Sequence, residues 1–390
     1  MCFAAAKCDP EAAVAADESY TILSGSRATV AMPPAGSTIN WLGQRYSEDA
    51  EMQPLAADAT KVYCFNEMMG INKRQRIHRS LHTGVMAIDA FVPIGRGQSM
   101  AIRLPPGISE EQLRRYMTHV IRAQEGNDLN ILSPTCSPEE ARMFRGLVGD
   151  IEPASRLTIV SGRDTTDNSL GEAVMAINSA TGMAERIRDE GGDALLLLDL
   201  EPLYRMWAVL EEVAAEQGMA EIAMQNQDAH INAIPEKDGG AFWKYIARSN
   251  ASTGRRRTFL GCFLQRAAQL SPERGGGSLS MLCFVRQQDD SQTSRRDLEA
   301  KLNNLKQMKL DDAMRKRAID KVEAQLAELA DDHRSAGVPD DFIEESKATT
   351  DGHLQFVDEA ATRADKPLRW CIDMQESVAR GITSITVQNQ

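Results

Sequence analysis

Strand-sized apolar runs alternate with longer helical patterns between about residue 80 and residue 287. The apolar runs cover 99–104, 129–132, 157–160, 194–198, 259–264 and 279–285, and the helical patterns cover 110–124, 138–146, 170–189 and 203–217. Strands that are apolar along their whole length and are separated by helices are typical of a parallel sheet covered on both faces. The alternation therefore predicts an α/β core.

Charge and hydropathy exclude several kinds of partner. The 390 residues include 44 Lys and Arg against 56 Asp and Glu, which gives a net charge of −12. Because an acidic surface does not offset phosphate repulsion, we expect no nucleic-acid partner and place the arginine run at 255–257 on a solvated loop. The run 194–198 is far shorter than the about 20 residues of a membrane-spanning helix, so we expect no direct membrane insertion. The 7 cysteines and 6 histidines are scattered without a C-x-x-C pair, so no metal site is predicted.

The patterns divide the chain into four parts. Residues 1–70 predict a disordered start and a small β-module, 71–293 the α/β core, and 336–390 a return of that core. Between them, residues 294–335 carry apolar side chains at spacings of three and four, which predicts a coiled-coil-like helical hairpin. Its apolar seam either joins the two helices to each other or docks another protein, and the pattern does not separate these alternatives.

Five blocks of sequence follow one another in the order that a single family would give them. Residues 83–98 read Thr-Gly-Val-Met-Ala-Ile-Asp-Ala-Phe-Val-Pro-Ile-Gly-Arg-Gly-Gln, and the other blocks are 185–199, 264–279, 350–356 and 369–380. Together they resemble the alpha subunit of F-type ATP synthases. The resemblance implies a P-loop (RecA-like) ATPase core with a reduced N-terminal β-module, an inserted hairpin that the family lacks, and no C-terminal helical bundle. It also implies proton-driven ATP synthesis as the setting, ATP synthase subunits such as beta as partners, and a mitochondrion or chloroplast as the location.

The phosphate loop of that family, G-x-x-x-x-G-K-[ST], falls on residues 104–111. Leu104 and Ser109 stand where the two glycines belong, and Glu110 and Glu111 stand where Lys and Thr belong. An anion in place of a cation repels phosphate, whereas Ser109 as an N-cap and two acidic residues in the first turn suit the start of a helix. We therefore expect that neither ATP nor Mg²⁺ binds in the family's manner and that the chain has no catalytic residues and is not an enzyme.

Two further positions match functional residues of the family. Asp199 follows the run 194–198 and matches the metal-associated aspartate of the Walker B strand. Arg380 matches the arginine finger that reaches into the nucleotide site of a neighbouring subunit. Each has an ordinary alternative, as a strand-end residue and as a solvated arginine.

The leading functional hypothesis is a non-catalytic, alpha-like protein, a pseudo-ATPase with a structural, assembly or regulatory role in an ATP synthase complex. The first alternative is a structural subunit of an unrelated assembly that is recruited through the hairpin at 294–333. The second is a residual nucleotide-binding protein with a rebuilt pocket.

Overall fold

The computed structural model describes residues 29–44, 60–66, 68–162, 170–216, 253–288, 319, 322, 337–358 and 370–380. Except for residues 319 and 322, the hairpin predicted at 294–335 lies outside these residues, and so do residues 1–28 of the part predicted at 1–70.

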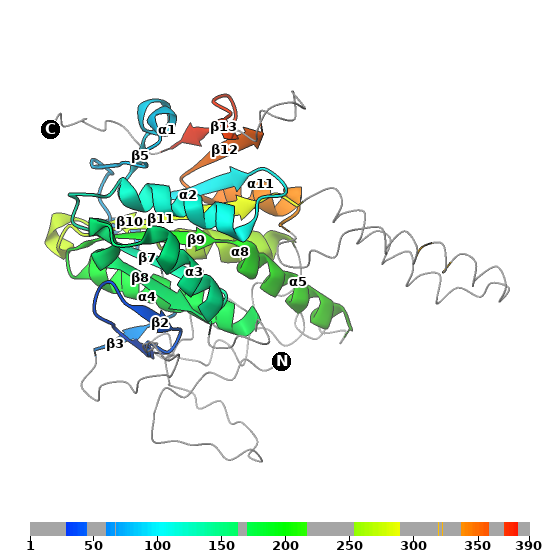
Figure 1. The fold of residues 1–390 in the computed structure, drawn as a ribbon, viewed down its shortest axis with the longest axis horizontal. Coiled ribbons are helices and arrows are strands. Elements are labelled where there is room, and N and C mark those ends of the chain that lie inside the picture. The colour runs from blue at the N-terminus through cyan, green and yellow to red at the C-terminus, as the bar shows by residue number, and fades with distance from the viewer. Residues whose placement is uncertain are drawn as a thin grey trace, which may run out of the picture.

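A mixed sheet of ten strands forms the centre of the fold (Figure 1). Its main path runs in the order β13 (Trp370–Ile372), β12 (Gly352–Asp358), β6 (Ser99–Leu104), β11 (Ser278–Arg286), β9 (Asp193–Asp199), β7 (Leu129–Thr135), β8 (Leu157–Ser161) and β2 (Thr38–Asn40). All neighbours from β12 to β2 are parallel, whereas β13 and the short strands β14 (Val378–Ala379) and β10 (Ala268–Gln269) pair antiparallel. The predicted α/β fold class is confirmed.

Helices cover both faces of this sheet. One face carries α2 (Glu110–Arg122) and α3 (Pro138–Val148), and the other carries α4 (Leu170–Asp189), α5 (Glu201–Glu216), α8 (Thr253–Leu264) and α11 (Asp340–Thr349). Side chains of one strand alternate between the two cores, as β11 shows: Met281 and Cys283 pack on the α4 side, and Leu282 and Phe284 on the α2 side. Burial on both faces explains why the strands are apolar throughout.

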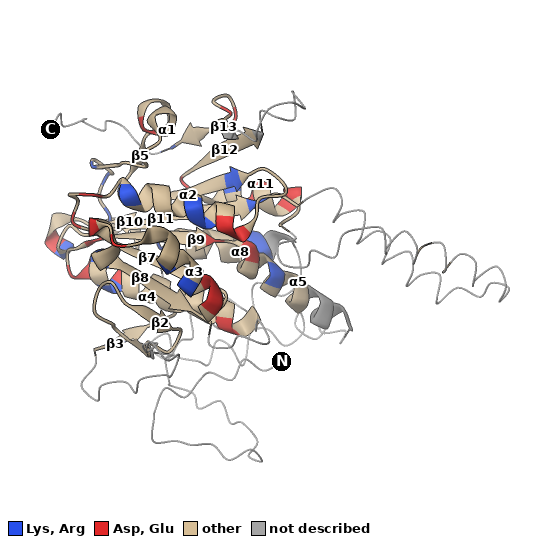
Figure 2. Cartoon of the chain, in the orientation of Figure 1, with Lys and Arg blue, Asp and Glu red and all other residues tan. Residues whose placement is uncertain are grey.

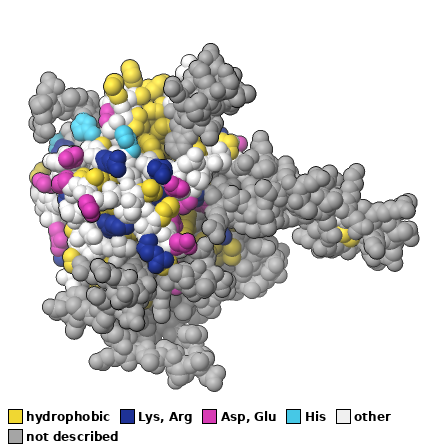
Figure 3. All heavy atoms as spheres, viewed as in Figure 1, with side chains coloured by type: hydrophobic (Ala, Val, Ile, Leu, Met, Phe, Trp, Pro, Cys, Tyr) yellow, Lys and Arg dark blue, Asp and Glu magenta, His cyan; other side chains and the backbone are white. Residues whose placement is uncertain are grey.

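Small elements surround the sheet. They are β1 (Thr29–Ala31) paired with β3 (Lys61–Tyr63), β4 (Ser80–Leu81) paired with β5 (Ile94–Gly95), the short helix α1 (Met86–Phe91), and the 3₁₀ turns η1 (Ile71–Lys73), η2 (Glu152–Arg156) and η4 (Pro272–Arg274). On the face shown in Figure 3, hydrophobic side chains gather over α1, where Met86 is 84% and Phe91 73% exposed.

Two expectations for residues 253–264 are wrong. Residues 259–264 were expected to form a strand, but they are the last turns of α8. Phe259, Leu260, Phe263 and Leu264 are buried at a helical spacing, and a short apolar run does not by itself distinguish a strand from a buried helix. The arginine run at 255–257 also lies in α8 and not on a solvated loop. Arg256 is buried and pairs with Glu345 of α11 at 2.7 Å.

Among the described helices, none is both long enough and apolar enough to span a bilayer.

Candidate functional site

The loop between β6 and α2 lies at the carboxyl edge of the parallel strands, where open α/β sheets bind their ligands. Leu104 is buried at the end of β6, and its carbonyl accepts a hydrogen bond from the Gln287 amide at 3.1 Å. Gly107 turns the chain with a φ of +78°. Ser109 then caps α2 in a reciprocal capping box with Gln112, as predicted for a helix start.

Glu110, the first residue of α2, is held by two arginines. One carboxylate oxygen accepts a hydrogen bond from Arg114 Nε at 2.9 Å, and the other lies 3.0 Å from Arg286 Nη1. Burial raises the pKa of this carboxyl, but Arg114 and Arg286 outweigh burial and bring the pKa to about 2. Glu110 is therefore ionised at neutral pH. Glu111, by contrast, is exposed and pairs with Arg115 at 2.6 Å.

Arg286 joins the phosphate-loop position to Asp199. It is the last residue of β11, which lies between β6 and β9, and its side chain is 5% exposed. Its Nη2 lies 2.6 Å from Asp199 Oδ2 and 3.0 Å from Glu201 Oε2. Sequence reasoning missed this residue, although a charged residue that ends an otherwise apolar strand is the signal that would have found it.

Arg114 forms the second half of the cluster. Its side chain is buried and pairs with Glu110 and with Glu140 of α3. It also donates to Ser133 Oγ at 3.2 Å, and its guanidinium lies 5.2 Å from the centre of the Phe144 ring. Glu140 in turn accepts the backbone amide of Cys136 at 2.7 Å. We call Glu110, Arg114, Glu140, Asp199, Glu201 and Arg286 the edge network.

Two carboxyls of the edge network hold protons more tightly than usual. Burial raises the pKa of Glu140 to about 8, although Arg114 opposes the shift. Burial likewise raises the pKa of Glu201 to about 7. The Asp199 charge also raises this pKa, whereas Arg286 lowers it. When both of these carboxyls are protonated, the two arginines face the carboxylates of Glu110 and Asp199. Figure 2 shows that α2 carries both acidic and basic residues, among them Glu110 and Arg114.

The donor set at this loop differs from what a nucleotide phosphate needs. Phosphates are held by backbone N–H groups and by free cations. Pro105 and Pro106 have no N–H, and both nearby guanidiniums already bind carboxylates. Within the described ranges, no three or more His, Cys, Asp or Glu side chains come together as metal ligands. The residues present therefore do not fit Mg²⁺-nucleotide in the way that the motif would hold it.

Arg380 lies at the opposite, amino edge of the sheet. Its amide donates to the Asp351 carbonyl at 2.9 Å, and its carbonyl accepts from Gln98 Nε2 at 2.5 Å. Its side chain is exposed, and no hydrogen bond or ion pair of that side chain is found among the described residues. Because β6 separates the two edges at about 3.3 Å per residue, Arg380 cannot reach the edge network of its own chain. The structure thus brings Glu110 and Asp199 together and leaves Arg380 apart.

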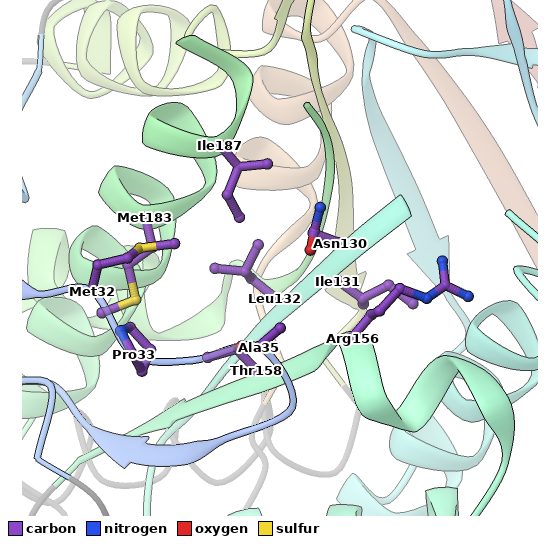
Figure 4. Close-up of a pocket in the computed structure, with 10 residues that line it drawn as sticks. All are labelled: Met32, Pro33, Ala35, Asn130, Ile131, Leu132, Arg156, Thr158, Met183 and Ile187. Carbon is purple, nitrogen blue, oxygen red and sulfur yellow. The ribbon is translucent and has the colours of Figure 1, made fainter. Parts of the chain in front are cut away.

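A cavity of about 80 Å³ also lies near the amino edge, between the starts of β7 and β8, the end of α4 and the chain after β1 (Figure 4). Its lining is mostly apolar, with Met32, Leu132, Met183 and Ile187, and contains no carboxylate. Arg156 turns its guanidinium toward backbone carbonyls at 3.2 Å. The cavity therefore has no group suited to phosphate or metal and is not part of the candidate site.

Comparison with known proteins relates part of this core to a family. Residues 84–226 match the model of the nucleotide-binding domain of the ATP synthase alpha/beta family, and this range contains the β6–α2 loop and Asp199. The predicted alpha-subunit-like resemblance is confirmed, and the parallel sheet with its helices agrees with a P-loop-like ATPase domain.

Relatives include three kinds of protein. The ATP synthase subunit alpha of Paracidovorax citrulli is 28% identical over 42% of this chain and 30% of its own length. The flagellum-specific ATP synthase of Agrobacterium fabrum is 28% identical over 48% of this chain and 37% of its own length. The SPI-2 type 3 secretion system ATPase of Salmonella typhimurium is 30% identical over 42% of this chain and 36% of its own length. The matched segment thus spans about a third of these relatives.

The relatives correct one expectation from the sequence. The replacement of Lys and Thr by Glu110 and Glu111 led us to expect that the chain is not an enzyme. The relatives are ATP synthases and an ATPase, so this expectation is wrong.

Proposed function

We propose that the chain acts as an alpha-like subunit in a multisubunit ATP synthase complex, in a structural, assembly or regulatory role. Its neighbour in that complex would be a nucleotide-binding subunit such as beta. The family match of residues 84–226 supports this proposal. An organellar location stays a prediction.

The position of Arg380 is the observation that carries the proposal. Its exposed side chain lies at the edge of the sheet away from its own phosphate-loop position, which leaves it available to a site on another chain. Exposed apolar side chains accompany it on the same segment, namely Met374 and Val378, and α1 adds Met86 and Phe91. An exposed apolar surface around a cation suits a contact with another protein. Arg380 would then stabilise the charge that develops on the phosphates of the neighbour.

The edge network supports the other half of the proposal, which concerns the chain's own loop. We propose that residues 104–111 do not hold ATP or Mg²⁺ in the family's manner, because Glu110 is ionised and both arginines are bound to carboxylates. To admit a phosphate, the loop would have to separate these buried ion pairs. The network would instead hold β6, β9 and β11 together as a rigid edge.

Reconstitution with the beta subunit of the same organism tests the proposal. We expect the two proteins to co-purify, and we expect Arg380→Ala to lower the ATPase rate of the complex by about 10³-fold without releasing the subunit. The matched control is Arg122→Ala, an exposed arginine on α2 that should leave the rate unchanged. Absence of co-purification would refute the assembly role, and an unchanged rate in the Arg380→Ala complex would refute the role in trans.

A further inference from the structure

A stretch without acidic residues precedes the matched domain and continues into its start. From Met68 to Ile88 the sequence contains no Asp or Glu, whereas it contains Lys73, Arg74, Arg76 and Arg79. This local surplus of positive charge contrasts with the net charge of −12 for the whole chain. We call these four cations, together with Ile71, the basic belt.

The basic belt is fixed to the body of the protein by its backbone. The Gln75 amide donates to the Gln269 carbonyl at 3.0 Å, and the Lys73 carbonyl accepts the Ser271 amide at 3.0 Å. Arg74 Nε donates to the Met69 carbonyl at 2.8 Å. These bonds hold the segment along β10, so its side chains are presented on a defined surface.

Few of the positive charges in the belt are neutralised. Arg79 is paired with Asp193 at 2.6 Å, but Arg96 shares the same carboxylate at 2.8 Å. Lys73 and Arg76 are exposed and have no ion-pair partner among the described residues. Two exposed arginines elsewhere on the described surface do have partners: Arg115 pairs with Glu111 at 2.6 Å and Arg186 with Glu190 at 2.5 Å.

Apolar side chains lie beside these cations. Ile71 is 84% exposed, and Met68 is 47% exposed. A large apolar side chain held open to water next to unpaired cations favours a partner that is both acidic and partly apolar, because burial of the side chain adds to the charge attraction.

We propose that the basic belt is a docking site for an acidic protein segment that carries an apolar side chain for Ile71. A nucleic acid fits less well, because residues 66–90 contain no Phe, Trp or Tyr on which bases could stack. An anionic membrane fits less well because the net charge of the whole chain repels an extended negative surface. The proposal does not depend on Arg380 or on the edge network.

Fluorescence anisotropy with a labelled Glu-rich peptide that contains two leucines tests this proposal. We expect saturable binding that weakens with added salt. The double variant Lys73→Gln/Arg76→Gln should bind about threefold to tenfold more weakly. The matched control, Arg122→Gln/Arg142→Gln, removes two exposed cations from α2 and α3 and should bind as the unaltered protein does. Ile71→Ser should weaken binding of the leucine-containing peptide by about tenfold and leave an all-Glu peptide unaffected.

Three outcomes would overturn the proposal. The first is no saturable binding of the peptide. The second is an equal loss of binding in the control double variant, which would show that only net charge matters. The third is binding of oligouridylate RNA or of phosphatidylserine vesicles that is as tight as peptide binding and equally sensitive to Lys73→Gln/Arg76→Gln.

Discussion

Replacing Arg286 by methionine should destabilise the fold far more than replacing an exposed arginine. The methionine keeps the length and the apolar part of the side chain but removes the guanidinium that contacts Glu110, Asp199 and Glu201. Glu110 retains Arg114, whereas no other salt bridge of Asp199 or Glu201 is found in the described part of the chain. The variant therefore leaves buried carboxylates without a cation.

The size of the loss in free energy of unfolding follows from the burial of these ion pairs. Removing one partner of a buried ion pair costs about 3–5 kcal/mol, whereas an exposed pair contributes about 0.2–1 kcal/mol. Carboxylates that lose their cation take up protons more readily, so the loss should be smaller at pH 5 than at pH 8. The control Arg115→Met removes an exposed partner of Glu111 and should cost less than about 1 kcal/mol at either pH.

Urea unfolding at the two pH values, followed by circular dichroism, measures these differences. Adding Glu110→Gln to Arg286→Met should cost less than the sum of the two single changes, with a coupling of about 1–3 kcal/mol. An Arg286→Met variant that loses no more free energy of unfolding than Arg115→Met would refute the reasoning. An equal loss at pH 5 and pH 8 would refute the part that concerns the carboxylates.

Three further predictions follow from other contacts. Glu140 should contribute stability that is lost as the pH rises from 4.5 to 8, because the folded chain holds its proton to a pKa of about 8. Calorimetry should show a shallower fall of the free energy of unfolding with pH for Glu140→Gln, which stays neutral. Ser109→Ala should cost about 1 kcal/mol in urea unfolding through loss of the α2 cap, and Ser109→Asp should restore most of it. Arg256→Met should lower the free energy of unfolding by about 3 kcal/mol and raise the rate of amide hydrogen exchange in α8 and α11. Arg257→Met, on the exposed side of α8, should change neither quantity.

The sequence predicts the strands of the sheet well because their signal is local. The run 99–104 has the same bounds as β6, and the pattern at 170–189 has the same bounds as α4. The run 259–264 is misread because Phe, Leu and Cys suit a buried helix as well as a buried strand. Length and flanking residues decide such cases, and here the helix begins at Thr253, before the apolar run.

The candidate site is predicted only in part because its contacts are long-range. The sequence places Glu110 at the start of a helix and Asp199 at the end of a strand, and the structure shows that both lie at one edge of the sheet. It does not reveal that Arg286 joins them, because that contact depends on β11 lying between β6 and β9 in the sheet. The pairing of Arg114 with Glu140 depends in the same way on the packing of α2 against α3.

Hydrogen exchange of the amides in the β6–α2 loop, with and without Mg·ATP at millimolar concentration, tests the central claim most directly. The edge network predicts that the amides between Gly107 and Gln112 exchange at the same rate in both conditions. Protection of these amides that saturates with nucleotide, and that Arg286→Met alters, would contradict the account.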